Sequence, residues 1–424
     1  MQPLNELSAS EAARRLVARD ITAEQMARAC LARIEEREAT VRAWIHLDAD
    51  AVLAQARQLD SGAVRGLLHG LPLGVKDLID TADMPTAYGS PIYAGHRPRA
   101  DAACVALARA AGALVLGKTV TTEFAWFYPG KTANPRNPAH TPGGSSSGSA
   151  AAVADCMVPL AFGTQTAGSI IRPASFCGIV GYKPTHGTLS RAGIKPLSDS
   201  LDTLGTMTRT VADAALFVSA LSGRDLLPKP LRQAPRIGIC RTPEWNAAQP
   251  ETAAAMENAV TALARAGATL SEFVLPQVFT GVTRAQIDIM NYEICAALAC
   301  ERLQHHAELS DKLKQLLEDA KQCDAARYDA AQALVASCSS QLDELFAGVD
   351  VLLAPSAPGA APAGLAATGD PIFCRMWTAL HVPAINLPCG LGPRGLPVGI
   401  QIIGRRGGDA RALAVAAWVH QRIA

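Results

Sequence analysis

The chain has 424 residues, of which 49% are hydrophobic, enough for a large buried core and too many for a disordered chain. Lys and Arg number 39 against 38 Asp and Glu, so a net charge of +1 excludes a strong overall field that would attract nucleic acid or an anionic membrane. The 11 cysteines form no CxxC pair, which argues against a zinc site or a thioredoxin-type motif and favours buried thiols in a reducing compartment. The N-terminus does not resemble a signal peptide, and no apolar run approaches the ~20 residues of a membrane helix, so we expect a cytoplasmic protein.

The first sixty residues are predicted to be helical. Capping-box spacings begin at Ser8 and Thr22, and apolar residues recur at helical spacing through residues 8–36. An alanine-rich stretch over residues 50–60 predicts a further helix.

After residue 70 the pattern of apolar and polar residues becomes typical of an α/β protein. Residues 71–78 are a short apolar run holding one lysine, residues 101–111 a helix, and residues 113–116 a buried strand. This strand, helix and strand rhythm argues for an α/β layered fold. Residues 129–149 are a long loop rich in Pro, Gly, Asn and Ser, a kind of loop that is often functional. Residues 150–162 predict a buried helix leading to a strand.

The remaining sequence continues the alternation without an internal repeat or a clear linker. We predict strands at 236–240, 349–353 and 396–403, and helices at 251–267, 285–346 and 408–423. The chain is therefore expected to form one domain over residues 1–424, in which the helical 285–346 segment is a candidate lobe on the main body.

Two serine- and glycine-rich segments, 142–149 and 163–169, offer hydroxyls and exposed backbone amides. A phosphate-binding P-loop is disfavoured because no lysine follows either set of glycines. Residues 144–148 satisfy GxSxG with Ser146 as nucleophile, but that motif needs a preceding strand, and residues 131–142 contain three prolines. A surface loop and a catalytic loop remain as alternatives.

Lys76 is the titratable residue on which a catalytic interpretation of these loops depends. It lies in an apolar run, and burial favours the neutral amine, which could activate a neighbouring serine without a histidine. The competing interpretation is a salt bridge from Lys76 to the adjacent Asp77 or another acid.

Several segments together resemble the amidase signature family. They are Gly74-Val75-Lys76-Asp77, the run 142–149, the run 163–173, Lys183-Pro184-Thr185 with Ser190 downstream, and the tail 396–404. The resemblance covers nearly the whole chain and keeps the order of the motifs. It implies one α/β/α layered domain around a large, twisted, mixed and mostly parallel β-sheet, with a cis peptide bond at the serine of the first loop.

The resemblance also implies a Ser-Ser-Lys triad. Ser169 would be the nucleophile, Ser145 the bridging serine and Lys76 the base. The backbone amides of the oxyanion hole would be those of Thr166, Ala167, Gly168 and Ser169, and Gly144 would contribute to substrate binding. No metal and no cofactor are expected. The expected partner is a small amide substrate, with neither nucleic acid nor membrane, and the resemblance allows a homodimer.

The second motif departs from the commonest family pattern, GTDTGGSIR. Gln165 replaces the acid, Ala167 replaces a glycine, and the arginine falls one residue later, at Arg172. In an extended segment such a shift changes the face on which a side chain lies. The Ser-x-x-Arg arrangement resembles the malonamidase branch, in which that arginine holds the carboxylate of the substrate. We therefore expect Arg172 to bind a carboxylate, with a structural ion pair as the alternative.

The predicted function is hydrolysis of a small carboxamide to a carboxylate and ammonia. The alternatives are an aryl or acyl amidase with an apolar pocket, the glutaminase subunit of a tRNA-dependent amidotransferase, and a silent scaffold, which the retained triad disfavours. Cys177 is interpreted as a core residue, and His305 and His306 lack a third metal ligand. Phe373, Arg375 and Trp377 are predicted to close the pocket or to pack in the core.

Overall fold

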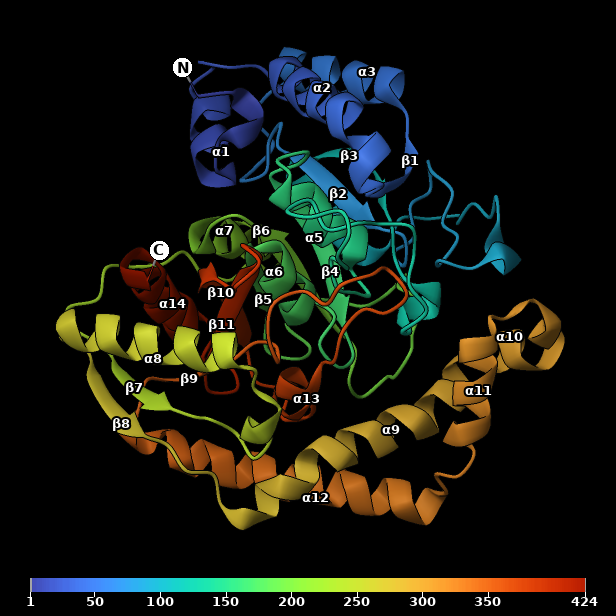
Figure 1. Ribbon diagram of the computed structural model, residues 1–424. Coiled ribbons are helices and arrows are strands. Elements are labelled where there is room, and N and C mark those ends of the chain that lie inside the picture. Colours follow the sequence, from blue (N-terminus) through green and yellow to red (C-terminus); the bar gives the residue numbers. More distant parts are fainter. Residues whose placement is uncertain (1, 424) are drawn as a thin grey trace.

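The computed structural model describes residues 2–423, and all strands of that range join one eleven-stranded sheet (Figure 1). The order across the sheet is β1-β3-β2-β4-β6-β5-β10-β11-β9-β7-β8. The strands are β1 (Trp44–Leu47), β2 (Pro72–Lys76), β3 (Leu114–Thr119), β4 (Leu160–Gln165), β5 (Val180–Lys183), β6 (Thr203–Thr208), β7 (Arg236–Ile239), β8 (Thr269–Glu272), β9 (Val351–Pro355), β10 (Ala384–Leu391) and β11 (Pro397–Ile403).

The sheet confirms the α/β class and the mixed pairing, but it is less parallel than expected. Six of its ten strand pairings are antiparallel. Parallel pairing occurs where β2 lies between β3 and β4, and where β7 lies between β8 and β9. The centre is antiparallel because β10 and β11 follow one another through a turn too short for a crossover helix, and because β6 separates β4 from β5.

The N-terminal helices form as their caps predict. Helix α1 (Ala9–Val17) begins where the backbone N–H of Glu11 donates to the Ser8 hydroxyl, and α2 (Ala23–Val41) begins with a capping box at Thr22. Helix α3 is Ala49–Ser61. These three helices lie together at the top of Figure 1.

Further helices pack against the sheet and position the two serine- and glycine-rich loops. Helices α5 and α6 contact one another and neighbouring strands, while α7 packs on β6, α14 packs on β10, and α7 and α14 contact each other. The bounds are α4 (Ala103–Ala110), α5 (Ser147–Ala154), α6 (Ile171–Cys177), α7 (Val211–Ser222), α8 (Pro250–Arg265), α13 (Ile372–Ala379) and α14 (Asp409–Ile423). Since α5 begins within the first loop and α6 begins two residues after the second, the packing of these helices fixes the positions of both loops.

The segment predicted to be helical over 285–346 falls on four α-helices, drawn in gold to orange along the bottom and lower right of Figure 1, which we call the helical arm. They are α9 (Val282–Ala297), α10 (Ala299–Gln304), α11 (Asp311–Ala320) and α12 (Ala325–Leu345). The helical arm contacts the main body through Ser310, whose hydroxyl donates to the carboxylate of Glu123, and through Lys195, whose Nζ lies 2.6 Å from a carboxylate oxygen of Glu301. Its status as a separate lobe stays a prediction.

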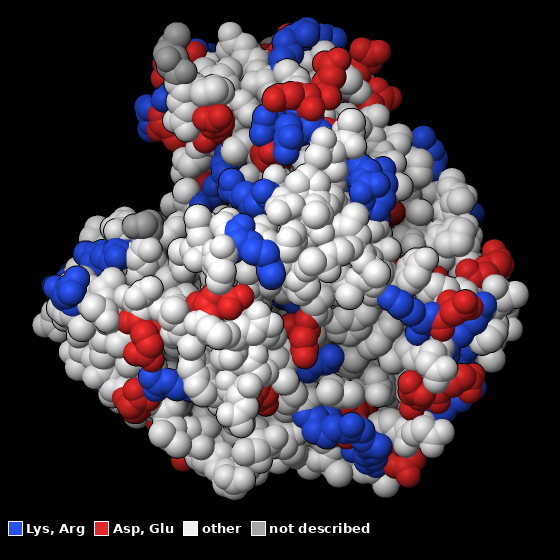
Figure 2. All heavy atoms as spheres, viewed as in Figure 1, with Lys and Arg blue, Asp and Glu red and all other residues white. Residues whose placement is uncertain are grey.

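Charged side chains of both signs are interspersed over the face drawn in Figure 2, in keeping with the balanced composition. Within residues 2–423, every helix is either too short or too polar to span a bilayer.

Candidate active site

The candidate site forms where two neighbouring parallel strands end. Lys76 is the last residue of β2, and Thr164 lies one residue before the end of β4. The peptide bond between Gly144 and Ser145 is cis, as the resemblance implied, and α5 starts just after it. The Nζ atom of Lys76 donates to Ser145 Oγ at 2.8 Å and to Thr164 Oγ1 at 2.6 Å. The fold therefore brings two of the three predicted triad residues into direct contact.

Lys76 has no salt bridge to Asp77. The Asp77 carboxylate instead lies 3.4 Å from the Nζ atom of Lys118, a second buried lysine. Burial lowers the pKa of Lys76 to about 7, while the nearby negative charge of Asp202 opposes that shift. A substantial fraction of Lys76 is consequently neutral near physiological pH and able to accept a proton.

The loop from Thr166 to Ser169 keeps its backbone amides unpaired. None of its N–H groups has a hydrogen-bond acceptor among residues 2–423. Its carbonyls are held from behind: the Thr378 hydroxyl donates to the Ala167 carbonyl at 2.8 Å, and the Gln286 amide donates to the Thr166 carbonyl at 2.9 Å. Fixed amides without an acceptor are the arrangement that stabilises a developing oxyanion.

The two serines of the predicted triad line the same small cavity. Its lining is otherwise small or apolar, apart from one arginine. The lining residues are Ala125, Trp126, Phe127, Ser145, Thr166, Ala167, Ser169, Arg172, Leu197 and Met290. A narrow, largely apolar cavity next to a neutral base suits a small substrate.

Gln165 explains how the chain tolerates losing the acid that the family commonly has. Its side-chain oxygen accepts the backbone N–H groups of Ile170 at 2.9 Å and Ile171 at 3.0 Å. Those amides belong to the first turn of α6, where free N–H groups need an acceptor. The glutamine oxygen fills that role without a negative charge.

Arg172 lies in helix α6 and not in the extended segment that the sequence analysis assumed, so the argument from alternating faces does not apply. Its Nη2 atom donates to the Gly144 carbonyl at 2.7 Å and to the Thr368 hydroxyl at 3.2 Å. Gly144 is required there because a Cβ would lie 2.7 Å from a methyl carbon of Thr368.

The alternative of a structural ion pair for Arg172 is wrong over residues 2–423, since no carboxylate there lies within salt-bridge distance of its guanidinium. Its Nε and Nη1 atoms are buried without a hydrogen-bond partner in the same range. Burial lowers the pKa of Arg172 to about 10, which still leaves the side chain charged at neutral pH. A buried cation with free donors beside Ser169 is suited to an anionic group of a ligand.

Competing nucleophiles are occupied by structural contacts. The Ser146 hydroxyl accepts from the backbone N–H of Thr164 at 3.2 Å and is fully buried, so the GxSxG match is accidental. Cys177 is also buried, and burial raises the pKa of its thiol to about 12. His305 pairs with Glu308, and no group of metal-ligating side chains occurs in the described part of the chain.

Sequence reasoning missed the residues that support the site from a distance. Thr164 lies inside the second motif and could have been recognised as a polar residue pointing from a buried strand. The others had no local signal, since they come from distant segments of the chain: Asp202, Gln286, Thr368 and Thr378.

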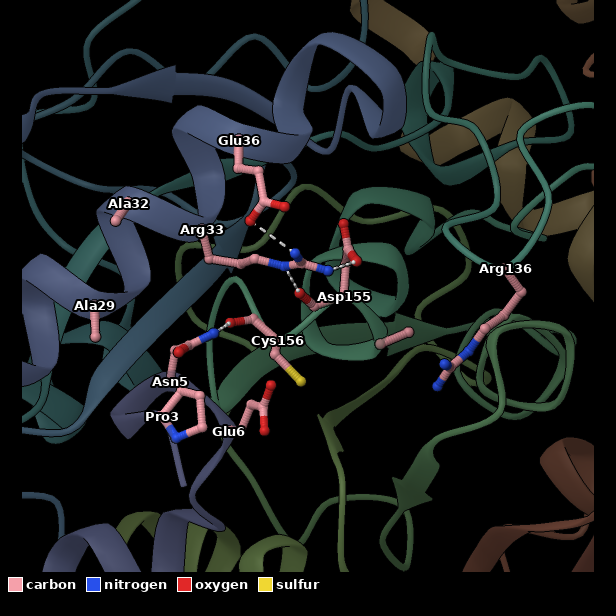
Figure 3. Close-up of a pocket in the computed structure, with 11 residues that line it drawn as sticks. Pro3, Asn5, Glu6, Ala29, Ala32, Arg33, Glu36, Arg136, Asp155 and Cys156 are labelled. Carbon is pink, nitrogen blue, oxygen red and sulfur yellow. Dashed lines mark hydrogen bonds and ion pairs between the residues drawn. The ribbon is translucent and has the colours of Figure 1, made fainter. Parts of the chain in front are cut away.

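A larger and more open hollow lies elsewhere, at the N-terminal helices (Figure 3). Its walls include Arg33, which pairs with Asp155 at 2.7 Å, and Cys156. None of the predicted site residues lines it. Size alone would therefore have indicated the wrong pocket.

Comparison with known proteins identifies the class. The sequence profile of the Amidase family matches residues 25–413, so the chain belongs to that family of amide hydrolases. A crystal structure of an amidase superposes with a TM-score of 0.91 at 31% identity and covers 99% of this chain and 100% of its own. The peptide amidase of Stenotrophomonas maltophilia superposes with a TM-score of 0.86 at 32% identity, covering 99% of this chain and 98% of its own.

Among curated relatives, the chain is 36% identical to the A subunit of the glutamyl-tRNA(Gln) amidotransferase of Chloroflexus aurantiacus, over 98% of this chain and 96% of that protein. It is 32% identical to the protein of the same name from Thermosynechococcus vestitus, over 92% of each. The fold and amide-bond chemistry expected from the sequence are confirmed, and the chain is an amidase.

Proposed function

We propose that Ser169 is the nucleophile of this amidase, Ser145 its proton relay and Lys76 its base. The observation that carries the proposal is the 2.8 Å contact between Lys76 Nζ and Ser145 Oγ, made by a fully buried lysine. A base with a pKa close to the working pH is the most effective in proton transfer. The shared cavity of Ser145 and Ser169 supports the transfer of the Ser169 proton to Ser145.

The mechanism requires no group beyond the chain and water. Ser169 Oγ attacks the amide carbonyl while its proton passes to Ser145, whose own proton passes to neutral Lys76. The backbone amides of Thr166, Ala167, Gly168 and Ser169 hold the oxyanion, and each such donor can lower the barrier by ~3–4 kcal/mol. The proton then returns through Ser145 to the leaving nitrogen, the C–N bond breaks, and water cleaves the acyl-enzyme by the same relay.

For the substrate we propose a small amide that carries a carboxylate, held by Arg172. The buried Nε and Nη1 atoms of Arg172 have no partner in the described range, and each can donate a hydrogen bond to an anionic group of a ligand. A purely apolar acyl group would leave this buried charge without a counterion, which disfavours the aryl amidase alternative.

The test is ammonia release from malonamate, propionamide and benzamide. We expect malonamate to be preferred, and Ser169→Ala to lower turnover at least ~10³-fold. Arg172→Lys should lower the preference for malonamate over propionamide, because a single ammonium group cannot place donors at both the Nε and the Nη1 positions of the guanidinium. Activity retained in Ser169→Ala would refute the triad, whereas an unchanged preference in Arg172→Lys would refute only the binding of the substrate carboxylate by Arg172.

A second candidate function is the glutaminase subunit of an amidotransferase complex. The curated relatives that carry the name of such a subunit cover nearly the whole chain and favour it. Glutamine would then be the preferred amide, and the chain would purify with a stoichiometric partner when its neighbouring proteins are co-expressed. Rapid malonamate hydrolysis by the isolated chain, with glutamine inert, would contradict it.

A further inference from the structure

Two arginines meet at one aromatic ring beside the catalytic cavity. The guanidinium carbon of Arg172 lies 5.3 Å from the centroid of the Phe127 ring, and that of Arg375 lies 5.9 Å from the same centroid. Arg172 belongs to α6 and Arg375 to α13, so only the tertiary fold brings them together. Phe127 and Arg172 line the cavity, whereas Arg375 does not. Arg375 therefore contacts the ring that lines the cavity without lining the cavity itself.

Neither arginine is neutralised by a partner. Within residues 2–423, no carboxylate lies within 4.0 Å of either guanidinium, and Asp370 acts on both only from a longer distance. Burial lowers the pKa of each guanidinium to about 10, so both stay charged at neutral pH. Arg172 is buried and Arg375 half-buried, and desolvated cations without counterions are unfavourable unless a ligand supplies the missing negative charge.

Each arginine is held in place while keeping donors available. Arg172 uses Nη2 for the Gly144 carbonyl, and its Nε and Nη1 atoms are buried without a partner among the described residues. Arg375 uses Nη1 for the side-chain oxygen of Gln286, at 2.5 Å. Because separate anchors hold them, the two cations define two positions for anionic groups.

Phe127 is a weak partner that a ligand can replace. A cation over an aromatic ring is stabilised by only ~0.5–2 kcal/mol, less than a charge-assisted, bidentate bond to a carboxylate. The segment leading to this ring contains two successive non-glycine residues with left-handed backbone, Phe124 at φ 44° and Ala125 at φ 62°. Such conformations are costly and concentrate in segments that rearrange around ligands.

We infer that Arg375 is a second specificity-determining residue, and that the preferred substrate is an amide whose acyl part carries two anionic groups. One group binds Arg172 next to Ser169. The other binds Arg375 after the Phe127 ring moves aside. This inference rests on the proposed function, which uses Arg172 alone, and it extends the substrate class from monoanionic to dianionic acyl groups.

The test measures binding of product-like anions, so it does not depend on turnover. Propane-1,2,3-tricarboxylate and glutarate differ by one carboxylate, and both can be titrated calorimetrically into the full chain at about pH 8 and constant ionic strength. We expect the tricarboxylate to bind at least ~10-fold more tightly than glutarate, which is about 1.4 kcal/mol. Arg375→Met should abolish that difference, and Arg172→Met should weaken both ligands.

Two further variants separate recognition from structural effects. Arg232→Met removes one exposed positive charge elsewhere and should leave the ratio of the two affinities unchanged. Gln286→Met removes the anchor of Arg375 and the contact with the Thr166 carbonyl, but keeps the cation. If Gln286→Met abolishes the preference as fully as Arg375→Met, Arg375 acts only by positioning that loop, and the inference fails.

Equal affinity of the parent chain for the two anions would also overturn the inference. Failure of the proposed function would look different, since Ser169→Ala would then retain amide hydrolysis whatever the two anions do.

Discussion

Lys76 and Lys183 are alike in nearly every local respect. Each is the last residue of a strand, β2 and β5 respectively, and each side chain is fully buried. Burial lowers the pKa of both to about 7, and a nearby aspartate opposes the shift in each case, Asp202 for Lys76 and Asp409 for Lys183. They differ in what the amine contacts.

The Nζ atom of Lys183 donates to the backbone carbonyls of Val382 at 2.5 Å and Pro184 at 3.3 Å. Carbonyls can only accept, so they cannot deliver a proton to a neutral lysine. Lys76 contacts two hydroxyls, Ser145 and Thr164, which can both donate and accept. Burial and a lowered pKa therefore do not make a base. A hydroxyl relay to the cavity is also required.

The sharpest test of this difference replaces each lysine by methionine. Lys76→Met should lower kcat/KM for the preferred amide by ~10²–10⁴-fold, because it removes the general base. Lys183→Met, the matched control, should lower it far less. Comparable losses in two folded variants, judged by circular dichroism, would mean that the contacts of the amine do not decide its role.

The dependence of the rate on pH follows from the protonation state of Lys76. The amine accepts a proton only when neutral, so kcat/KM should fall below about pH 7, by about tenfold per pH unit. This limb should persist in Lys183→Met, although the pKa of Lys183 is lowered equally. If the fall in kcat/KM below about pH 7 disappeared in Lys183→Met, the titrating group would be Lys183 and not Lys76.

The titration of Lys183 should instead affect how the free energy of unfolding depends on pH. Because its pKa is lowered in the fold, the unfolded chain binds more protons between about pH 7 and 10.5, and stability gains up to ~1.4 kcal/mol per pH unit from this group as pH rises. Lys183→Met removes that gain together with two hydrogen bonds. The destabilisation caused by Lys183→Met should therefore shrink as pH falls from about 10 to 7 in urea unfolding. A difference independent of pH would contradict this account.

The smallest effect concerns Asp202, whose negative charge raises the pKa of Lys76. Asp202→Asn should move the acid limb of kcat/KM to lower pH, since the charged amine loses a stabilising neighbour. The side-chain oxygen that remains can still accept from the backbone amides of Leu197 and Ser198. A lower rate at every pH with an unmoved limb would indicate a purely structural role for Asp202.

Several elements could be predicted from the sequence because the residues that specify them are adjacent in the chain. The capping box at Thr22, the lysine in the apolar run that became β2 and the two glycine- and serine-rich loops were all recognised from adjacent residues. Strands β1, β5, β6, β8 and β10 were missed, and with β5, β6 and β10 the antiparallel centre of the sheet. Their order depends on pairing between distant segments, which no short window of sequence encodes.

The sequence by itself determined which residue types could perform the chemistry: a lysine in an apolar run, serines among glycines and an arginine three residues after Ser169. Only the tertiary structure decided their partners. It placed Lys76 on Ser145 instead of Asp77, set Arg172 in a helix without a carboxylate partner in the described range, and brought Arg375 to the same ring. The physical reason is that the sequence decides which titratable and charged groups are present. Burial and packing decide the pKa of each group and which neighbour can give it a proton, take one from it or pair with its charge.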